Sequence, residues 1–168
     1  MRKLVAGFLL VTATVVFAAG EQAKATLKNA QGQTVGDATL TETPHGVLIH
    51  VRLTSAPAGV HAFHIHASGK CEPPFASAAG HFNPASKQHG IENQMGMHAG
   101  DLPNIDVPSG GALTFDVMNR DVTLNPGANS LLDADGSAIV IHDKADDYKS
   151  DPAGNAGDRV ICGVITKS

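Results

Sequence analysis

Short apolar segments alternate with turn-forming clusters along most of the chain, from residue 22 onward. The stretch 46–53 shows this best, because Val47, Ile49 and Val51 alternate with Leu48, His50 and Arg52, as expected for a strand with one buried face. Similar apolar or β-branched segments occupy 23–27, 61–66, 112–118, 138–142 and 159–165. Gly-, Pro-, Asn- and Asp-rich clusters lie at 29–32, 57–59, 108–111, 125–127 and 133–136. The pattern predicts an all-β fold, an antiparallel sandwich or barrel.

Two long polar segments, 67–106 and 143–158, interrupt this rhythm. Both are rich in Gly and Pro, and they contain or border most of the histidines. Structureless loops of that length in a compact domain are usually functional or disordered, so we expect the chemistry of the protein to lie there.

Length and composition narrow the class of protein. A chain of 168 residues suits a single domain, and 42% hydrophobic with 17% charged residues is enough to form a core. Nine histidines stand beside two cysteines and one tyrosine. Because imidazole is the commonest metal ligand among side chains, this excess indicates metal chemistry.

The first residues are typical of an export signal. Met1-Arg2-Lys3 precedes an uncharged apolar run over 4–19, followed by Gly20 and Glu21. The alternative is an uncleaved membrane anchor, but 16 apolar residues fall short of the roughly 20 needed to span a bilayer. We predict that 1–19 is a secretory signal peptide, that 20–168 is the mature domain, and that this domain is periplasmic or secreted without a stable membrane anchor. Small residues over 18–25 offer alternative cleavage sites.

Removal of a signal peptide changes the net charge of the chain, and export changes the interpretation of its two cysteines. The chain has a net charge of −4, and without Arg2 and Lys3 it has ten basic and 16 acidic residues, a net charge of −6. This balance argues against nucleic acid as a partner. In an oxidising compartment Cys71 and Cys162, the only cysteines, are expected to form a disulfide; the alternative is two buried thiols. Neither is in a Cys-x-x-Cys motif, which argues against thiol redox chemistry.

The histidines form a constellation of their own. His64 and His66 are two residues apart in a predicted strand, so their imidazoles project from one face. His142 ends the apolar run 138–141, where a polar group at the edge of a core needs a partner. Three histidines and a carboxylate fall within 21 residues and make a plausible closed zinc set: His81, His89, His98 and Asp101. The alternative for this last group is a polar loop with scattered histidines.

Several motifs together resemble the bacterial secreted copper,zinc superoxide dismutases. They are FHIH at 63–66, GHFNP at 80–84, HAGDL at 98–102, HDKADD at 142–147, GNAG at 154–157, Arg159, and CGVI at 162–165. They occur in the family order and cover nearly the whole predicted mature chain. The resemblance implies a Greek-key β-barrel or sandwich of about eight antiparallel strands with two long functional loops.

The resemblance also implies a site and a reaction. Copper would be bound by His64, His66, His81 and His142, and zinc by His81, His89, His98 and Asp101. His81 would be shared, with one ring nitrogen on each metal. The implied activity is redox disproportionation of the superoxide anion to oxygen and hydrogen peroxide, which would protect against extracytoplasmic superoxide. Two residues would be catalytic: His81, which takes up and returns a proton, and Arg159, which attracts and orients the anion.

Supporting residues match the family as well. Asp146 resembles an aspartate that hydrogen-bonds a copper-site and a zinc-site histidine, here expected to be His64 and His89. Cys71 and Cys162 match the family's disulfide, which ties the loop before His81 to the last strand. The loop 143–158 is shorter than in eukaryotic members and lacks a clear counterpart of their glutamate pair. Anion attraction would therefore depend on copper, Arg159 and a nearby lysine, Lys144 or Lys149.

Other features have plainer interpretations. His45 and His50 are interpreted as exposed strand residues, and His61 as a structural residue outside the site. Met95 and Met97 could recruit Cu(I), although flexible loop residues are the commoner case. The segment 133–136 suggests a calcium loop but lacks the remaining ligands, and is interpreted as a turn.

Alternative functions stay open at this point. The chain could be an exported copper and zinc buffer, a superoxide-dismutase-like binding module, or an interaction domain indifferent to metal. All four copper positions are filled, which favours the enzyme. Family members vary in assembly, so both a monomer and a homodimer fit the sequence.

Overall fold

The computed structural model describes residues 20–168, so the predicted signal peptide, 1–19, lies outside the described residues. The strands are β1 (Gln22–Asn29), β2 (Thr34–Thr43), β3 (Gly46–Leu53), β4 (Gly59–His61), β5 (Phe63–His66), β6 (Ile105–Val107), β7 (Leu113–Asn119), β8 (Ala138–His142), β9 (Arg159–Val164) and β10 (Thr166–Lys167). One 3-10 turn, η1 (Ala76–Ala78), lies in the first long loop.

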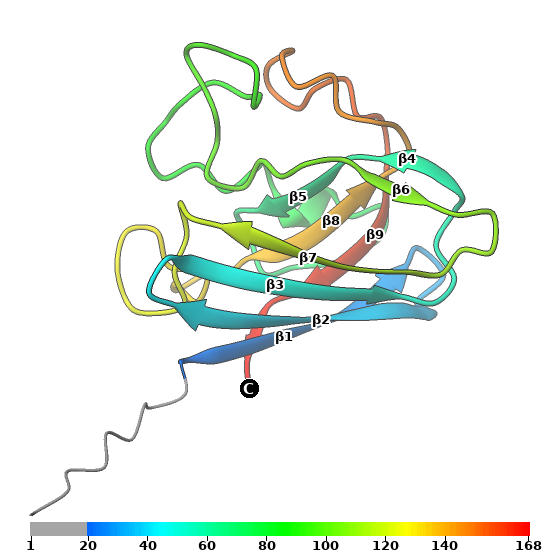
Figure 1. Cartoon of the computed structure of the whole chain (residues 1–168), viewed down its shortest axis with the longest axis horizontal. Coiled ribbons are helices and arrows are strands. Elements are labelled where there is room, and N and C mark those ends of the chain that lie inside the picture. The colour runs from blue at the N-terminus through cyan, green and yellow to red at the C-terminus, as the bar shows by residue number, and fades with distance from the viewer. Residues whose placement is uncertain (1–19) are drawn as a thin grey trace, which may run out of the picture.

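The strands form one large curled antiparallel sheet in the order β5-β8-β9-β1-β2-β3-β7, with β10 added beside β1. β4 and β6 pair separately as a two-stranded sheet above it (Figure 1). This arrangement confirms the all-β prediction. Over residues 20–168, no helix has the length and apolar character required for a membrane crossing.

Alternating side chains explain where the core lies. In β3, Val47, Ile49 and Val51 are buried while His50 and Arg52 are exposed, as the sequence pattern predicts. The strands β5 and β8 differ because every one of their residues is buried. Apolar side chains from both strands join the main core, and their histidines are buried as well. These histidines therefore lie on strands that are covered on both faces.

Three elements differ from the sequence-based prediction. β2 is a ten-residue strand that the pattern did not predict, because its threonines and the Gly36-Asp37 pair hide the alternation of Ala38 and Leu40 toward the core. The predicted strand 61–66 is two strands, since Ala62 leaves the ladder to bond with the second long loop and with β8: its N–H donates to the Lys144 carbonyl at 2.8 Å and its carbonyl accepts from the His142 N–H at 3.0 Å. The end of the first long loop pairs with β4 as β6.

The predicted disulfide between Cys71 and Cys162 is confirmed, with a Cα–Cα distance of 5.7 Å. It joins the first long loop to β9, and Cys162 packs in a small apolar cluster with Phe75, Ala78 and Val140. In the chain-entropy model, closing a loop of 91 residues stabilises the fold by roughly 4–5 kcal/mol. The bond fixes this loop against the strand that begins at Arg159.

Candidate metal centre

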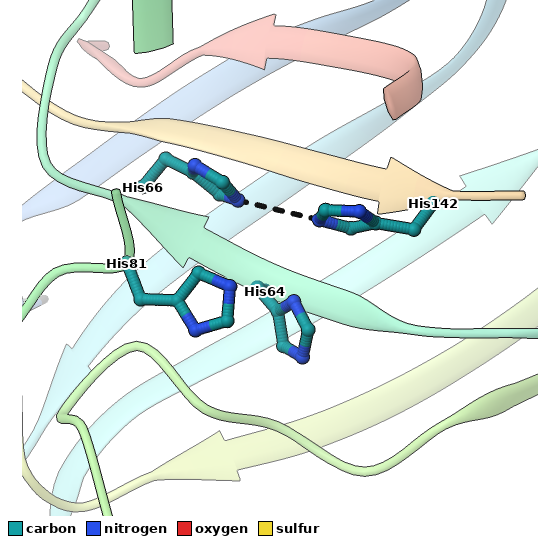
Figure 2. A group of neighbouring side chains, drawn as sticks. All are labelled: His64, His66, His81 and His142. Carbon is teal, nitrogen blue, oxygen red and sulfur yellow. Dashed lines mark hydrogen bonds between the residues drawn. The ribbon is translucent and has the colours of Figure 1, made fainter. Parts of the chain in front are cut away.

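Four histidines converge where β5 and β8 lie side by side. His64 and His66 project from the same face of β5, and His142 lies at the end of the neighbouring β8 (Figure 2). The Nε2 atoms of His66 and His142 are 3.4 Å apart. His81 comes from the first long loop, and its ring centroid is 4.1 Å from that of His64. One ring nitrogen from each of these four histidines lies within 4.8 Å of the other three.

Backbone pairing holds part of the first long loop along the free edge of β5. Isolated bridges pair His66 with His81 and His64 with Asp101. The Ile65 N–H donates to the Gly100 carbonyl at 2.9 Å, and the Ile65 carbonyl accepts from the Phe82 N–H at 2.8 Å. A side chain at position 100 would collide with the Ile65 carbonyl, so this close approach requires glycine.

The second cluster gathers around the Asp101 carboxylate. Its Oδ1 lies 2.8 Å from His81 Nδ1, 3.0 Å from His89 Nδ1 and 3.3 Å from His98 Nδ1. Its Oδ2 accepts from the backbone N–H groups of Gly90 and His98 at 2.9 and 3.0 Å. All four side chains are buried or nearly so, and their ligand atoms also lie within 4.8 Å of one another.

His81 belongs to both clusters. Its Nδ1 faces Asp101, whereas its Nε2 is buried without a hydrogen-bond partner among the described residues. His64 Nδ1 is likewise buried and without such a partner. A buried polar atom without a partner is energetically costly, and a lone-pair donor in this position suits a metal ion. The nitrogens of the first cluster and the mixed nitrogen and oxygen atoms of the second therefore fit two bound metal ions.

The buried Asp146 connects the two clusters from behind. The His64 Nε2–H donates to its Oδ2 at 2.8 Å, and the His89 Nε2–H donates to its Oδ1 at 3.0 Å. With those protons on Nε2, each ring turns its Nδ1 toward its own cluster. The predicted contacts of Asp146 with both histidines are present.

Charge distribution differs between the clusters. Burial, with the neighbouring His81, lowers the pKa of His66 to about 2, and burial likewise lowers the pKa values of His142 to about 3 and His81 to about 4. These rings are neutral at pH 7, as metal binding requires. Burial alone would lower the pKa of His89, but hydrogen bonds to Asp101 and Asp146 outweigh it and raise this pKa to about 9.

Both carboxylates are ionised. Burial would raise the pKa of Asp101 and of Asp146, but hydrogen bonds from the histidines hold both pKa values well below the ordinary range. The second cluster therefore concentrates negative charge in the buried interior, which favours a divalent cation there.

The half-buried Arg159 opens β9 directly opposite His142 in the sheet. Its guanidinium donates to the Phe75 carbonyl at 2.7 Å and to the Ala79 carbonyl at 2.6 Å. The same Ala79 carbonyl accepts from His66 Nδ1 at 2.9 Å. Arg159 is thus anchored through the disulfide-bonded loop beside the first cluster.

The remaining candidates lie outside the clusters. His50 is exposed and pairs with Asp116 at 2.6 Å, while the buried His61 contacts the His142 and Pro57 carbonyls at 2.8 and 3.0 Å. Lys149 forms an ion pair with Glu92 at 2.7 Å, and Met95 is 70% exposed.

Two contacts were not predicted from the sequence. The Asp151 Oδ1 accepts from the backbone N–H of His89 at 2.6 Å, and Asn104 hydrogen-bonds the backbone of Asp146. Neither residue stands in a pattern that marks such a role.

Comparisons with known proteins agree with this geometry. The family model described as copper/zinc superoxide dismutase matches residues 34–165. Superoxide dismutase [Cu-Zn] 2 of Aquifex aeolicus is 49% identical over 165 residues, covering 96% of this chain and 95% of the relative. Superoxide dismutase [Cu-Zn] 1 of the same organism is 51% identical over 144 residues, covering 84% and 85%. The crystal structure of a SOD-like protein from Bacillus subtilis has a TM-score of 0.82 at 39% identity, covering 89% of this chain and all of that one.

Proposed function

The chain belongs to the copper/zinc superoxide dismutase family, and on that premise we propose which of its residues bind each metal. The protein is a superoxide dismutase, with superoxide as substrate and copper and zinc as cofactors. His64, His66, His81 and His142 bind copper, and His81, His89, His98 and Asp101 bind zinc. The observation that carries this assignment is His81, whose two ring nitrogens face different clusters and whose Nε2 is buried without a partner among the described residues.

The donor atoms fit the two metals differently. Four imidazole nitrogens suit Cu(II), and nitrogens combined with a carboxylate oxygen suit Zn²⁺. Bound copper supplies the one-electron redox chemistry that the reaction needs, and zinc, which has no redox chemistry, supplies a fixed charge. Asp146 fixes the orientation of His64 and His89, so that each ring presents Nδ1 to its metal.

His81 is placed to move the proton of the reaction. Its Nδ1 is turned toward Asp101, so Nε2 is the nitrogen on the copper side. The single lone pair of Nε2 can hold either the metal or a proton, so a proton taken up from water while Nε2 is free of copper would be released to the product when the ligand bond re-forms. We therefore assign His81 both a ligand role and a proton-carrying role.

Arg159 provides the positive charge for the substrate. The predicted mature chain has a net charge of −6, which by itself would repel the superoxide anion. A guanidinium is permanently charged and presents a planar fork of donors, and here two carbonyls hold it beside the copper histidines. Lys144, which is exposed two residues after His142, is the lysine that adds to this field, whereas Lys149 is neutralised by Glu92.

We further propose that residues 1–19 are a signal peptide and that 20–168 function in the periplasm or outside the cell, without a stable membrane anchor. The Cys71–Cys162 disulfide supports an oxidising compartment. There the enzyme would remove extracytoplasmic superoxide.

Metal analysis combined with direct observation of superoxide decay tests this function, using purified residues 20–168. We expect one copper and one zinc per chain and rapid catalysed decay. A protein that binds both metals without accelerating decay is a metal buffer, and that outcome contradicts the enzymatic proposal. Spectroscopy of the loaded protein must also show one ligand common to both metals; two separate sites would overturn the role of His81.

A further inference from the structure

We propose that Asn104 is a positioning residue for the metal centre: it holds Asp146, and through Asp146 the rings of His64 and His89, in the orientation that metal binding needs. This inference depends on the proposed metal assignment. It goes beyond that assignment because Asn104 touches neither cluster.

Asn104 forms two hydrogen bonds with the backbone of Asp146. Its Nδ2 donates to the Asp146 carbonyl at 2.9 Å, and its Oδ1 accepts from the Asp146 N–H at 2.8 Å. Two opposed hydrogen bonds to one residue set its orientation as well as its position. Only a side chain with both a donor and an acceptor in this geometry can make the pair, so Asn104 is better suited than aspartate.

Tyr148 completes a closed ring of hydrogen bonds with Asn104 and Asp146. The Asn104 N–H donates to Tyr148 Oη at 2.7 Å, and the Tyr148 N–H donates to Asp146 Oδ1 at 2.6 Å. The Tyr148 carbonyl also accepts from the Glu92 N–H at 3.0 Å. Tyr148 has a φ of +63°, a left-handed conformation that non-glycine residues rarely adopt, and these contacts hold it there.

These hydrogen bonds join the two long loops next to the two clusters. Asn104 lies three residues after Asp101 on the first loop, while Asp146 and Tyr148 belong to the second. Both Asp146 oxygens are already used, one by His64 and one by His89. A shift of the Asp146 backbone would therefore displace the contacts to both rings together.

The experiment compares zinc release from the fully loaded wild-type protein with release from Asn104→Ala and Asn104→Asp. Zinc transfer to a colorimetric chelator gives the rate. We expect release about tenfold faster in both variants, at the lower end of the roughly 10–100-fold weakening seen when a direct partner of a metal ligand is lost, because Asn104 acts through Asp146. Asn104→Asp is the sharper variant, because it keeps the shape and the acceptor while replacing the donor to the Asp146 carbonyl.

Asn129→Ala is the matched control. Asn129 also donates from Nδ2 to a backbone carbonyl, that of Asp121 at 2.8 Å, but it is exposed and lies outside both long loops. Its zinc release should match the wild type to within about twofold, as for surface substitutions away from special contacts. Co²⁺ bound at the zinc site gives a second measure: its visible spectrum should change in Asn104→Asp and stay unchanged in Asn129→Ala.

Tyr148→Phe keeps the inference testable if the Asn104 variants fail to fold, because it removes only the acceptor of the Asn104 N–H. We expect zinc release that is faster than wild type and slower than in Asn104→Asp. The chain has one tyrosine and no tryptophan, so intrinsic emission reports Tyr148 directly and should change in Asn104→Asp.

Two failures are distinguishable. A wild-type protein that binds no zinc contradicts the metal assignment itself. A wild-type protein that holds zinc, with release from Tyr148→Phe, and from Asn104→Asp where that variant folds, within about twofold of it, overturns the positioning role of Asn104.

Discussion

The two metal clusters are built on different kinds of support. The histidines that we assign to the copper side, His64, His66 and His142, come from β5 and β8, where the register of paired strands sets the positions of their backbones. The residues that we assign to the zinc side, His89 and His98, come from a long loop, and the contacts that gather them are made by the Asp101 and Asp146 carboxylates. The comparison teaches that one half of the centre is organised by the sheet and the other by side-chain charge.

The electrostatics follow the same division. The pKa values of His66, His81 and His142 are lowered to between about 2 and about 4, so these three rings are neutral donors in a buried setting. The zinc side combines two ionised carboxylates with His89, whose pKa is raised to about 9. A divalent cation there neutralises buried charge that the sheet does not compensate, so we expect zinc to contribute more to stability than copper does.

The largest expected effect is on activity, from His142→Ala on the strand-borne side. Removing this proposed copper ligand should reduce superoxide decay by at least about a thousandfold, because enzymes accelerate reactions by far more and this one depends on its redox centre. Zinc content should stay close to one ion per chain. The rate of superoxide decay measures the activity, and metal analysis measures the zinc content. Retained activity, or loss of zinc together with copper, would show that the halves are not separately supported.

Selective removal of zinc tests the loop-borne side. Zinc at 100 times its Kd stabilises the fold by about 2.7 kcal/mol, which for a domain of this size corresponds to roughly 5–10 °C in Tm. We expect the zinc-free protein to lose about this much, and the copper-free protein to lose less. Calorimetry of the two partly loaded forms checks the order. Equal losses would contradict the difference in support, and identical melts with and without chelator would exclude a stabilising metal.

Arg159→Ala should lower the rate of superoxide decay about tenfold at low ionic strength, at the lower end of electrostatic steering effects, without loss of metal. Arg159→Lys should recover part of the rate, since it keeps the charge but not the fork of donors that Phe75 and Ala79 accept. An unchanged rate in Arg159→Ala at low ionic strength would remove Arg159 from the proposed mechanism.

The smallest effects are expected from the two lysines of the second long loop. Lys144→Gln should slow decay by about two- to threefold at low ionic strength and not at high salt, as for a screened surface charge. The double variant Lys149→Gln/Glu92→Gln serves as the matched control and should have no effect, because it removes an ion pair that carries no net charge. The salt dependence of the decay rate distinguishes the Lys144 variant from its control. Equal effects in both would mean that the ion pair is not what distinguishes the two lysines.

Local sequence patterns predicted most of the strands and little of the structure of the two long loops. Alternation located β3, and the spacing of His64 and His66 correctly placed both on one face, because a strand repeats every two residues. The same reasoning missed β2, whose polar composition hides its inward residues, and it treated β6 as loop because its partner β4 lies more than 40 residues earlier. The ligand sets were expected from the resemblance to a family rather than from periodicity.

By itself, the sequence determined the all-β class, the two long loops, the pairing of Cys71 with Cys162 and the residues that gather at the centre. Only the tertiary structure decided which ring nitrogen of His81 faces which cluster and that Asn104 and Tyr148 hold Asp146. The reason is physical: periodicity records which face of a strand is buried, whereas a hydrogen bond between two loop residues that are 42 positions apart in the sequence leaves no local pattern.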